Sequence, residues 1–130
     1  MFEFDKNQRL HSRKRTETLF KQGKSFLIFP LSVRYIIKQG QGNVSVLVVC
    51  PKKYQKKAVS RNRIKRLIRE NYRLNSLKLK ELAATKQLDI DFSLSYVNKQ
   101  MTDYITMQKT ILAILDKLSE NVQNLTVISA

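Results

Sequence analysis

The chain has 130 residues, of which 42% are hydrophobic, so it is long enough and apolar enough for one folded core. We expect a single domain over residues 1–130, with loose ends at about 1–8 and 123–130. The chain carries 25 Lys and Arg against 10 Asp and Glu, a formal net charge of +15. No run approaches the ~20 apolar residues of a membrane span. The first residues lack a signal-peptide pattern, and the single cysteine cannot form an internal disulfide, so we expect a cytoplasmic protein.

The first predicted element is a short helix over residues 9–22, with Leu19 and Phe20 as its apolar residues. Gly23 follows it, and a glycine at that point is typical of a left-handed residue that ends a helix.

Strands are predicted next. Residues 25–38 are rich in β-branched and aromatic side chains, and Pro30 marks a break or a sheet edge because it has no N–H to donate. After a turn at residues 40–43, residues 44–50 are almost all apolar. Such a run predicts a strand at the centre of a sheet.

The second half of the chain is mainly helical. A long helix is predicted over residues 58–74, and it continues or restarts over residues 77–86. Residues 88–97 predict a strand, and residues 103–122 an amphipathic helix with apolar residues at helical spacing. This order of elements indicates an α+β fold.

The positive charge is concentrated in one segment. Residues 52–73 hold ten Lys and Arg and one acid, Glu70, a net charge of +9, whereas residues 89–130 hold three Lys and five acids, a net charge of −2. Such a local field favours a polyanion as partner, nucleic acid first and an anionic membrane surface second. The alternative is a solvated, merely solubilising face.

The predicted helix over residues 58–74 has two different faces. With about 100° of rotation per residue, its apolar side chains form one stripe that can pack on a sheet. They are Ile64, Leu67, Ile68 and Tyr72. A basic stripe points away from the core, and Arg61 and Arg63 lie at the margins between the two stripes. Its members are Asn62, Lys65, Arg66, Arg69 and Arg73.

A line of cations on one helix suits phosphate groups. Arginine offers a planar fork of donors that can pair two phosphate oxygens, and the free N–H groups of the helix start also favour an anion. A helix face kept only for stability would interleave glutamates for ion pairs, and only Glu70 is available.

Residues 58–70, with Arg61-Asn62-Arg63 at their centre, resemble the signature helix of the bacterial ribonuclease P protein family. Residues 19–25 resemble the first helix and following turn of that family. Residues 48–53 resemble its third strand and the Lys-Lys that ends it. The similarity covers about residues 9–120 in order and spacing.

The resemblance implies a two-layer α/β sandwich with the order αβββαβα. It also implies an unusual left-handed βαβ crossover, from residues 44–50 through the helix to residues 88–97. Physical principles alone would predict the right-handed connection.

The resemblance further implies the protein subunit of ribonuclease P, an endoribonuclease whose catalytic site is expected in its RNA subunit. The chain would bind the catalytic RNA and the 5′ leader of precursor tRNA. Mg²⁺ is expected in the RNA-containing holoenzyme, whereas no cofactor on the protein alone, no obligate protein partner and no membrane are implied. The implied RNA-binding residues are Lys52, Lys53, Arg61, Asn62, Arg63, Lys65, Arg66, Arg69 and Arg73.

A leader-binding cleft between the first helix and the sheet would contain Phe20, on which a base can stack, with Arg34 near it. The chain departs from the family pattern at Thr16, where many members carry a second aromatic residue. It also departs at Leu47 and Val49, where the family often has Gly-x-Ser. These departures affect the details of leader binding and not the basic helix.

No catalytic or metal site is predicted in the chain itself. His11 lacks a visible partner, Cys50 reads as a buried strand residue, and Asp89 and Asp91 share a strand face without further ligands. Three alternatives remain: a ribosomal or other structural RNA-binding protein without a role in cleavage, a DNA-binding module, and a membrane-surface or calmodulin-type helix.

Overall fold

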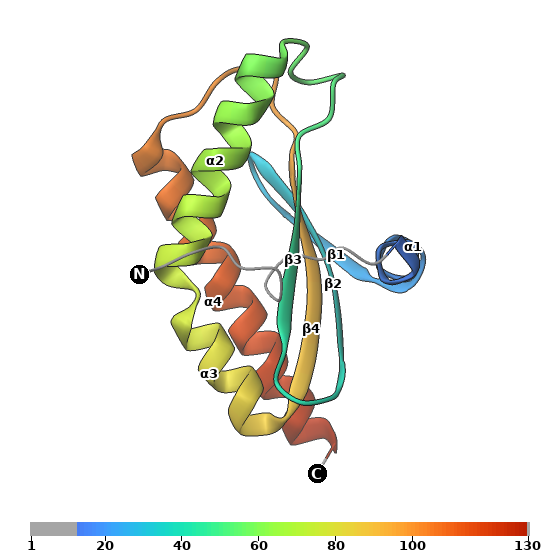
Figure 1. The fold of residues 1–130 in the computed structure, drawn as a ribbon. Coiled ribbons are helices and arrows are strands. Elements are labelled where there is room, and N and C mark those ends of the chain that lie inside the picture. Colours follow the sequence, from blue (N-terminus) through green and yellow to red (C-terminus); the bar gives the residue numbers. More distant parts are fainter. Residues whose placement is uncertain (1–12, 130) are drawn as a thin grey trace.

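Four strands form one mixed sheet with helices on both faces (Figure 1). A computed structural model describes the backbone of residues 13–129 and the side chains of residues 14–123. In this part of the chain, no helix is both long and apolar enough to cross a membrane. The elements are α1 (Arg13–Gln22), β1 (Lys24–Ile28), β2 (Leu31–Gln39), β3 (Val44–Val49), α2 (Ala58–Asn75), α3 (Leu77–Lys86), β4 (Leu88–Tyr96) and α4 (Tyr104–Ser129).

The strands lie in the order β1-β2-β4-β3. β1 pairs antiparallel with β2, and β2 pairs antiparallel with β4. β3 pairs parallel with β4, and the chain joins these two strands through α2 and α3. The α+β class and the predicted order αβββαβα are therefore confirmed, with α2 and α3 as the restarted helix. The left hand of the crossover stays the expectation that the resemblance carries.

The prediction that residues 44–50 form a central strand is wrong, because β3 is an edge strand and the central strands are β2 and β4. Val44, Val46 and Val48 are buried on one face of β3, and Leu47 and Val49 are partly buried on the other. The apolar run therefore indicates that other parts of the protein pack on both faces of the strand. It does not indicate that a strand pairs with each of its two edges.

The core lies between the sheet and the layer formed by α2, α3 and α4, whereas α1 lies on the opposite face of the sheet (Figure 1). Ile64, Ile68 and Tyr72 of α2 are 0% exposed, and Leu67 is partly buried against the same core. The Tyr72 ring meets the Phe92 ring of β4 edge to face, with 5.6 Å between the ring centroids. The apolar stripe predicted for this helix is confirmed as the packed one.

One predicted turn agrees with the structure and one differs from it. Residues 25–38 divide at Pro30 into the hairpin strands β1 and β2, in agreement with the predicted break. Gly23 does not adopt the predicted left-handed conformation. A glycine is needed there because a Cβ atom would lie 2.3 Å from the Leu19 carbonyl oxygen. Within residues 13–129, the non-glycine residue with a left-handed backbone is Gln87, which ends α3 with φ 53°.

The last helix is longer than predicted. It begins after Asp103, whose Oδ1 accepts the backbone N–H of Thr106 at 2.8 Å, and it runs to Ser129. The helix continues past residue 122 because this segment contains no glycine or proline to stop it. The expectation of a loose end at 123–130 stays a prediction. The expectation for residues 1–8 lies outside the described residues.

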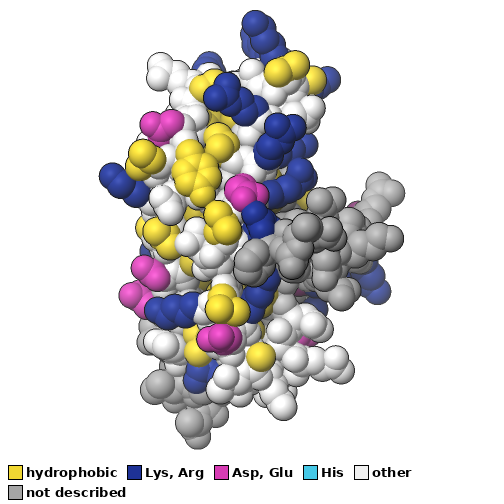
Figure 2. Space-filling model, turned by 60° about the vertical axis from the view of Figure 1, so that its left-hand side comes forward, with side chains coloured by type: hydrophobic (Ala, Val, Ile, Leu, Met, Phe, Trp, Pro, Cys, Tyr) yellow, Lys and Arg dark blue, Asp and Glu magenta, His cyan; other side chains and the backbone are white. Residues whose placement is uncertain are grey.

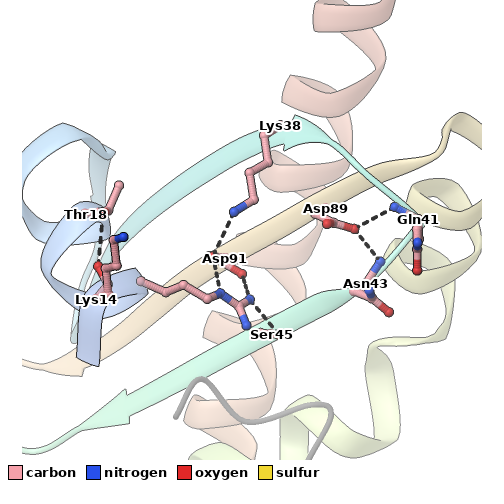
Figure 3. A network of polar contacts seen from close by, with 9 residues as sticks. Lys14, Thr18, Lys38, Gln41, Asn43, Ser45, Asp89 and Asp91 are labelled. Carbon is pink, nitrogen blue, oxygen red and sulfur yellow. Dashed lines mark hydrogen bonds and ion pairs between the residues drawn. The ribbon is translucent and has the colours of Figure 1, made fainter. Parts of the chain in front are cut away.

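Asp89 closes the turn between β2 and β3 (Figure 3). Its Oδ1 accepts the backbone N–H groups of Gln41 at 2.9 Å and Asn43 at 3.0 Å. Burial acts to raise the pKa of Asp89. The backbone N–H groups of Asn43, Gln41 and Gly42, together with the charge of Lys38, outweigh burial and hold that pKa below its ordinary value.

Asp89→Asn should lower the free energy of unfolding by about 1 kcal/mol near neutral pH, because this exposed carboxylate loses its charge toward several N–H donors. The folded-state pKa lies below the unfolded value of about 3.9. The stabilisation is therefore complete above that value and disappears as the pH falls through the folded-state pKa. Urea unfolding at neutral and acid pH measures it, with the exposed Asp116→Asn as control. A difference that stays constant across this range would contradict the assignment.

Candidate nucleic-acid interface

Cationic side chains gather where α2 begins. In Figure 2, Lys and Arg side chains crowd the upper end of the molecule, where Figure 1 places the start of α2 and the loop before it. Five of the nine predicted RNA-binding residues are exposed: Lys52, Lys53, Asn62, Arg63 and Arg66. The other four are partly buried: Arg61, Lys65, Arg69 and Arg73. The structure thus brings the nine residues onto one loop and one helix.

Arg61 braces the basic loop. Its Nη1 donates to the carbonyl oxygens of Gln55 at 3.1 Å and Lys56 at 2.8 Å. Gln55 is buried, and its Nε2 donates to the carbonyl of Asn98 at 2.9 Å, which ties the loop to the segment after β4. Arg61 therefore stabilises the conformation of the loop that carries Lys52 and Lys53. Its Nη1 is already hydrogen-bonded to the protein.

Arg73 is engaged by the protein as well. Its guanidinium forms an ion pair with the Glu70 carboxylate one turn earlier, and its side chain is only 20% exposed. The charge of Arg73 is thus offset within the helix. Among the nine residues it is the weakest candidate for a phosphate contact.

Two further groups lie near the start of α2. The Lys53 ammonium lies 5.1 Å from the centroid of the Tyr54 ring, which orients the end of the basic loop. Cys50 is a buried free cysteine, as predicted, but it lies directly after the last residue of β3 and not within the strand. Burial raises the pKa of its thiol, and the positive charges of Lys65 and Arg61 oppose that rise.

The residues predicted for leader binding meet on the other face of the sheet. Phe20, in the last turn of α1, is 40% exposed. The Arg34 guanidinium carbon of β2 lies 5.7 Å from the centroid of the Phe20 ring, and Arg34 Nη1 donates to the Phe20 carbonyl at 3.0 Å. Arg34 thus satisfies a carbonyl at the helix end, where a cation is favourable. It also holds a charge beside an exposed aromatic ring.

The sheet surface beside these residues is mixed, with serines on β2 and β4 and the apolar Leu47 and Val49 on β3. The strand register places Arg34 opposite Ser93, and Ser32 opposite Ser95, all on the α1 side. Thr16 lies one helical turn before Phe20 and is partly exposed. This side of the sheet therefore offers the Phe20 ring, the Arg34 guanidinium and the partly exposed hydroxyl groups of Ser32 and Ser95.

The sequence reasoning missed the contact that holds α1 on the sheet. The Arg15 guanidinium donates to both carboxylate oxygens of Asp91 on β4, one of them at 3.1 Å (Figure 3). Lys38 Nζ lies 3.9 Å from Asp91 Oδ2. Asp91 is 4% exposed, and its hydrogen bond raises the pKa of Arg15. An aspartate in the middle of a strand was the available signal, because such a buried charge requires a partner.

The carboxylates of Asp89 and Asp91 share a sheet face, as predicted, but the protein's own donors occupy each of them. No group of three or more His, Cys, Asp or Glu within the described residues could hold a metal ion. His11 lies outside these residues. The arrangement as a whole offers charge, stacking and hydrogen bonds toward a polyanion on two separate surfaces.

Comparisons with known proteins show the family of the chain. The sequence model described as Ribonuclease P matches residues 4–119. A Porphyromonas gingivalis protein named "Ribonuclease P protein component" is 33% identical over 123 residues, which cover 93% of this chain and 90% of that protein. The structure of the RNase P protein from Thermotoga maritima has a TM-score of 0.65 at 28% identity, covering 84% of this chain and 96% of that one. The Staphylococcus aureus RNase P protein, at 22% identity, shares the fold with a TM-score of 0.62, over 87% of this chain and 96% of that one.

Proposed function

The chain belongs to the ribonuclease P protein family, and from that premise we propose that it assists removal of the 5′ leader from precursor tRNA. Membership of the family implies a subunit of an endoribonuclease that associates with the ribonuclease P RNA. Our proposal also assigns a different RNA segment to each of the two surfaces. The loop 50–57 and α2 bind the catalytic RNA, and the α1 side of the sheet binds the leader.

The observation that carries the proposal is the orientation of α2. Ile64, Ile68 and Tyr72 are fully buried, so the helix cannot turn its basic stripe inward. Arg66 is exposed on the stripe and Arg63 at its margin, and Glu70, the one acid of the helix, pairs with Arg73. The stripe thus keeps a surplus of cations that a phosphate backbone would neutralise, with release of counterions.

Leader binding is supported by the pair Phe20 and Arg34. Single-stranded RNA exposes its bases, which stack on aromatic rings and on guanidinium planes. The half-exposed Phe20 ring offers such a face, and Arg34 adds a charge for the backbone. A single aromatic residue, with Thr16 in place of a second one, suits binding of the leader without strong sequence preference.

The reaction we propose is hydrolysis of one phosphodiester bond, with the catalytic site in the RNA subunit. Mg²⁺ held by that RNA supplies the activated water and the charge stabilisation. The protein lowers the repulsion between two polyanions and holds the leader. A cytosolic setting, where Cys50 stays reduced, is part of the same proposal.

Reconstitution tests the proposal as a whole. The purified chain, mixed with a bacterial ribonuclease P RNA at low Mg²⁺, should stimulate cleavage of precursor tRNA at its mature 5′ end, because the protein screens charge that Mg²⁺ would otherwise have to screen. The rate is compared with that of the RNA alone. Binding to ribosomal RNA without any stimulation would favour a structural RNA-binding protein instead.

Arg66→Ala and Arg69→Ala should weaken binding to the catalytic RNA. Each lost phosphate contact should flatten the slope of log affinity against log salt concentration by roughly 0.7–0.9. Lys109→Ala, which removes one exposed charge from α4, is the matched control and should change neither quantity. Wild-type affinity and slope in both arginine variants would remove this face of α2 from the interface.

Phe20→Ala should weaken binding of precursor tRNA to the holoenzyme about tenfold while leaving mature tRNA unaffected, because a stacked base contributes ~1–3 kcal/mol. Tyr104→Ala is the matched control, since Tyr104 is equally exposed, at 40%, but lies on the helical layer. Equal losses for precursor and mature tRNA would exclude Phe20 from the leader site.

A further inference from the structure

The attachment of α1 to the rest of the molecule is small. α1 has ten residues and no acid in its first turn, and a helix of that length is marginal in water by itself. Leu19 is its one fully buried apolar side chain among the described residues, and it lies outside the main core cluster. The position of α1 therefore depends on few contacts.

Three positions that face the sheet are spaced by four residues along one face of the helix. Arg15 binds Asp91, Leu19 is buried in the middle, and Gly23 follows the last residue of the helix. A Cβ atom on Gly23 would lie 3.2 Å from the Tyr35 carbonyl oxygen, so the end of the helix lies directly against β2.

The contact between Arg15 and Asp91 fixes the orientation of α1 on the sheet as well as its distance from β4. Two guanidinium nitrogens face the two carboxylate oxygens of Asp91, and Arg15 Nη2 also donates to the Ser45 hydroxyl of β3 at 3.2 Å (Figure 3). Such a forked pair sets orientation as well as separation. It ties the first turns of α1 to β4 and β3, while Arg34 of β2 holds the last turn through the Phe20 carbonyl.

We infer that Arg15 and Asp91 form a positioning pair that sets α1 on the sheet and thereby places Phe20 for the leader. The inference rests on the proposed function and extends it to two residues that do not themselves touch the leader. Without the pair, α1 remains attached through Leu19 and its C-terminal end, and its first turns can move away from β4. The helix can then pivot about that end, so the Phe20 ring no longer has one fixed angle to the sheet.

The pair acts on leader binding and not on the fold as a whole. The main core lies on the other face of the sheet and contains no residue of α1. The helix α2, which carries the basic stripe, also lies on that other side of the sheet (Figure 1). Removal of the pair should therefore leave both the domain and its grip on the catalytic RNA in place.

The test measures binding of two RNAs to the reconstituted holoenzyme, a precursor tRNA with a leader and the same tRNA without it. The ratio of the two affinities is the leader contribution. Arg15→Ala and Asp91→Asn should each reduce that contribution about fivefold or more, since a displacement of ~1 Å can cost that much at a positioned site. The double variant should lose no more than either single one, because both remove the same contact.

Two further variants separate positioning from general effects. Arg15→Lys keeps the charge but loses the fork, and it should restore part of the leader contribution. Lys109→Ala removes an equal charge from α4 and should change nothing. Should Asp91→Asn fail to fold, Arg15→Lys and Arg15→Ala carry the test.

The outcomes separate the two proposals. A wild-type holoenzyme that binds both RNAs equally would contradict leader binding itself. A wild type with a clear leader contribution, which Arg15→Ala and Arg15→Lys retain within about twofold, would overturn the positioning pair. Equal losses for both RNAs, or losses that add up in the double variant, would overturn it too.

Discussion

The packing of one helix stripe determines how this molecule meets its partner. Ile64, Ile68 and Tyr72 of α2 are all 0% exposed, and burial of each such side chain contributes ~1.5–3 kcal/mol. Rotation of α2 about its axis would expose all three at once. The positions about 100° and more away from them must therefore face outward, and there the chain carries Arg63 and Arg66. Packing of the apolar face against the sheet thus forces the cationic side chains of α2 to face the solvent.

Helices are attached to the two faces of the sheet in different ways. On one face, α2, α3 and α4 enclose the core, and this face supports the basic stripe. On the other face, α1 is held by Leu19, the forked contact of Arg15 with Asp91, and Arg34 at its end. Under the proposed function, the rigid surface serves the catalytic RNA, and the lightly attached helix serves the single-stranded leader.

Features that depend on local periodicity could be predicted from the sequence. The two stripes of α2, the break at Pro30 and the order of the elements follow from spacing of 3.6 or 2 residues and from proline chemistry. The edge position of β3 could not be predicted. An apolar run shows that both faces of a strand are packed, but it does not show how many strands pair with it. The partners of Arg15 and Arg61 were equally hidden. Asp91 is 76 residues from Arg15, and the carbonyl acceptors of Arg61 carry no side-chain signature.

The account is tested most directly by lysine footprinting of the chain with and without the ribonuclease P RNA. Acetylation of each lysine is followed by mass spectrometry in the free protein and in the complex. The account predicts that the RNA protects Lys52, Lys53 and Lys65 while Lys109 and Lys117 on α4 react as before. Protection of the α4 lysines, with Lys52, Lys53 and Lys65 still reactive, would show that the RNA binds elsewhere and would contradict the central role of α2.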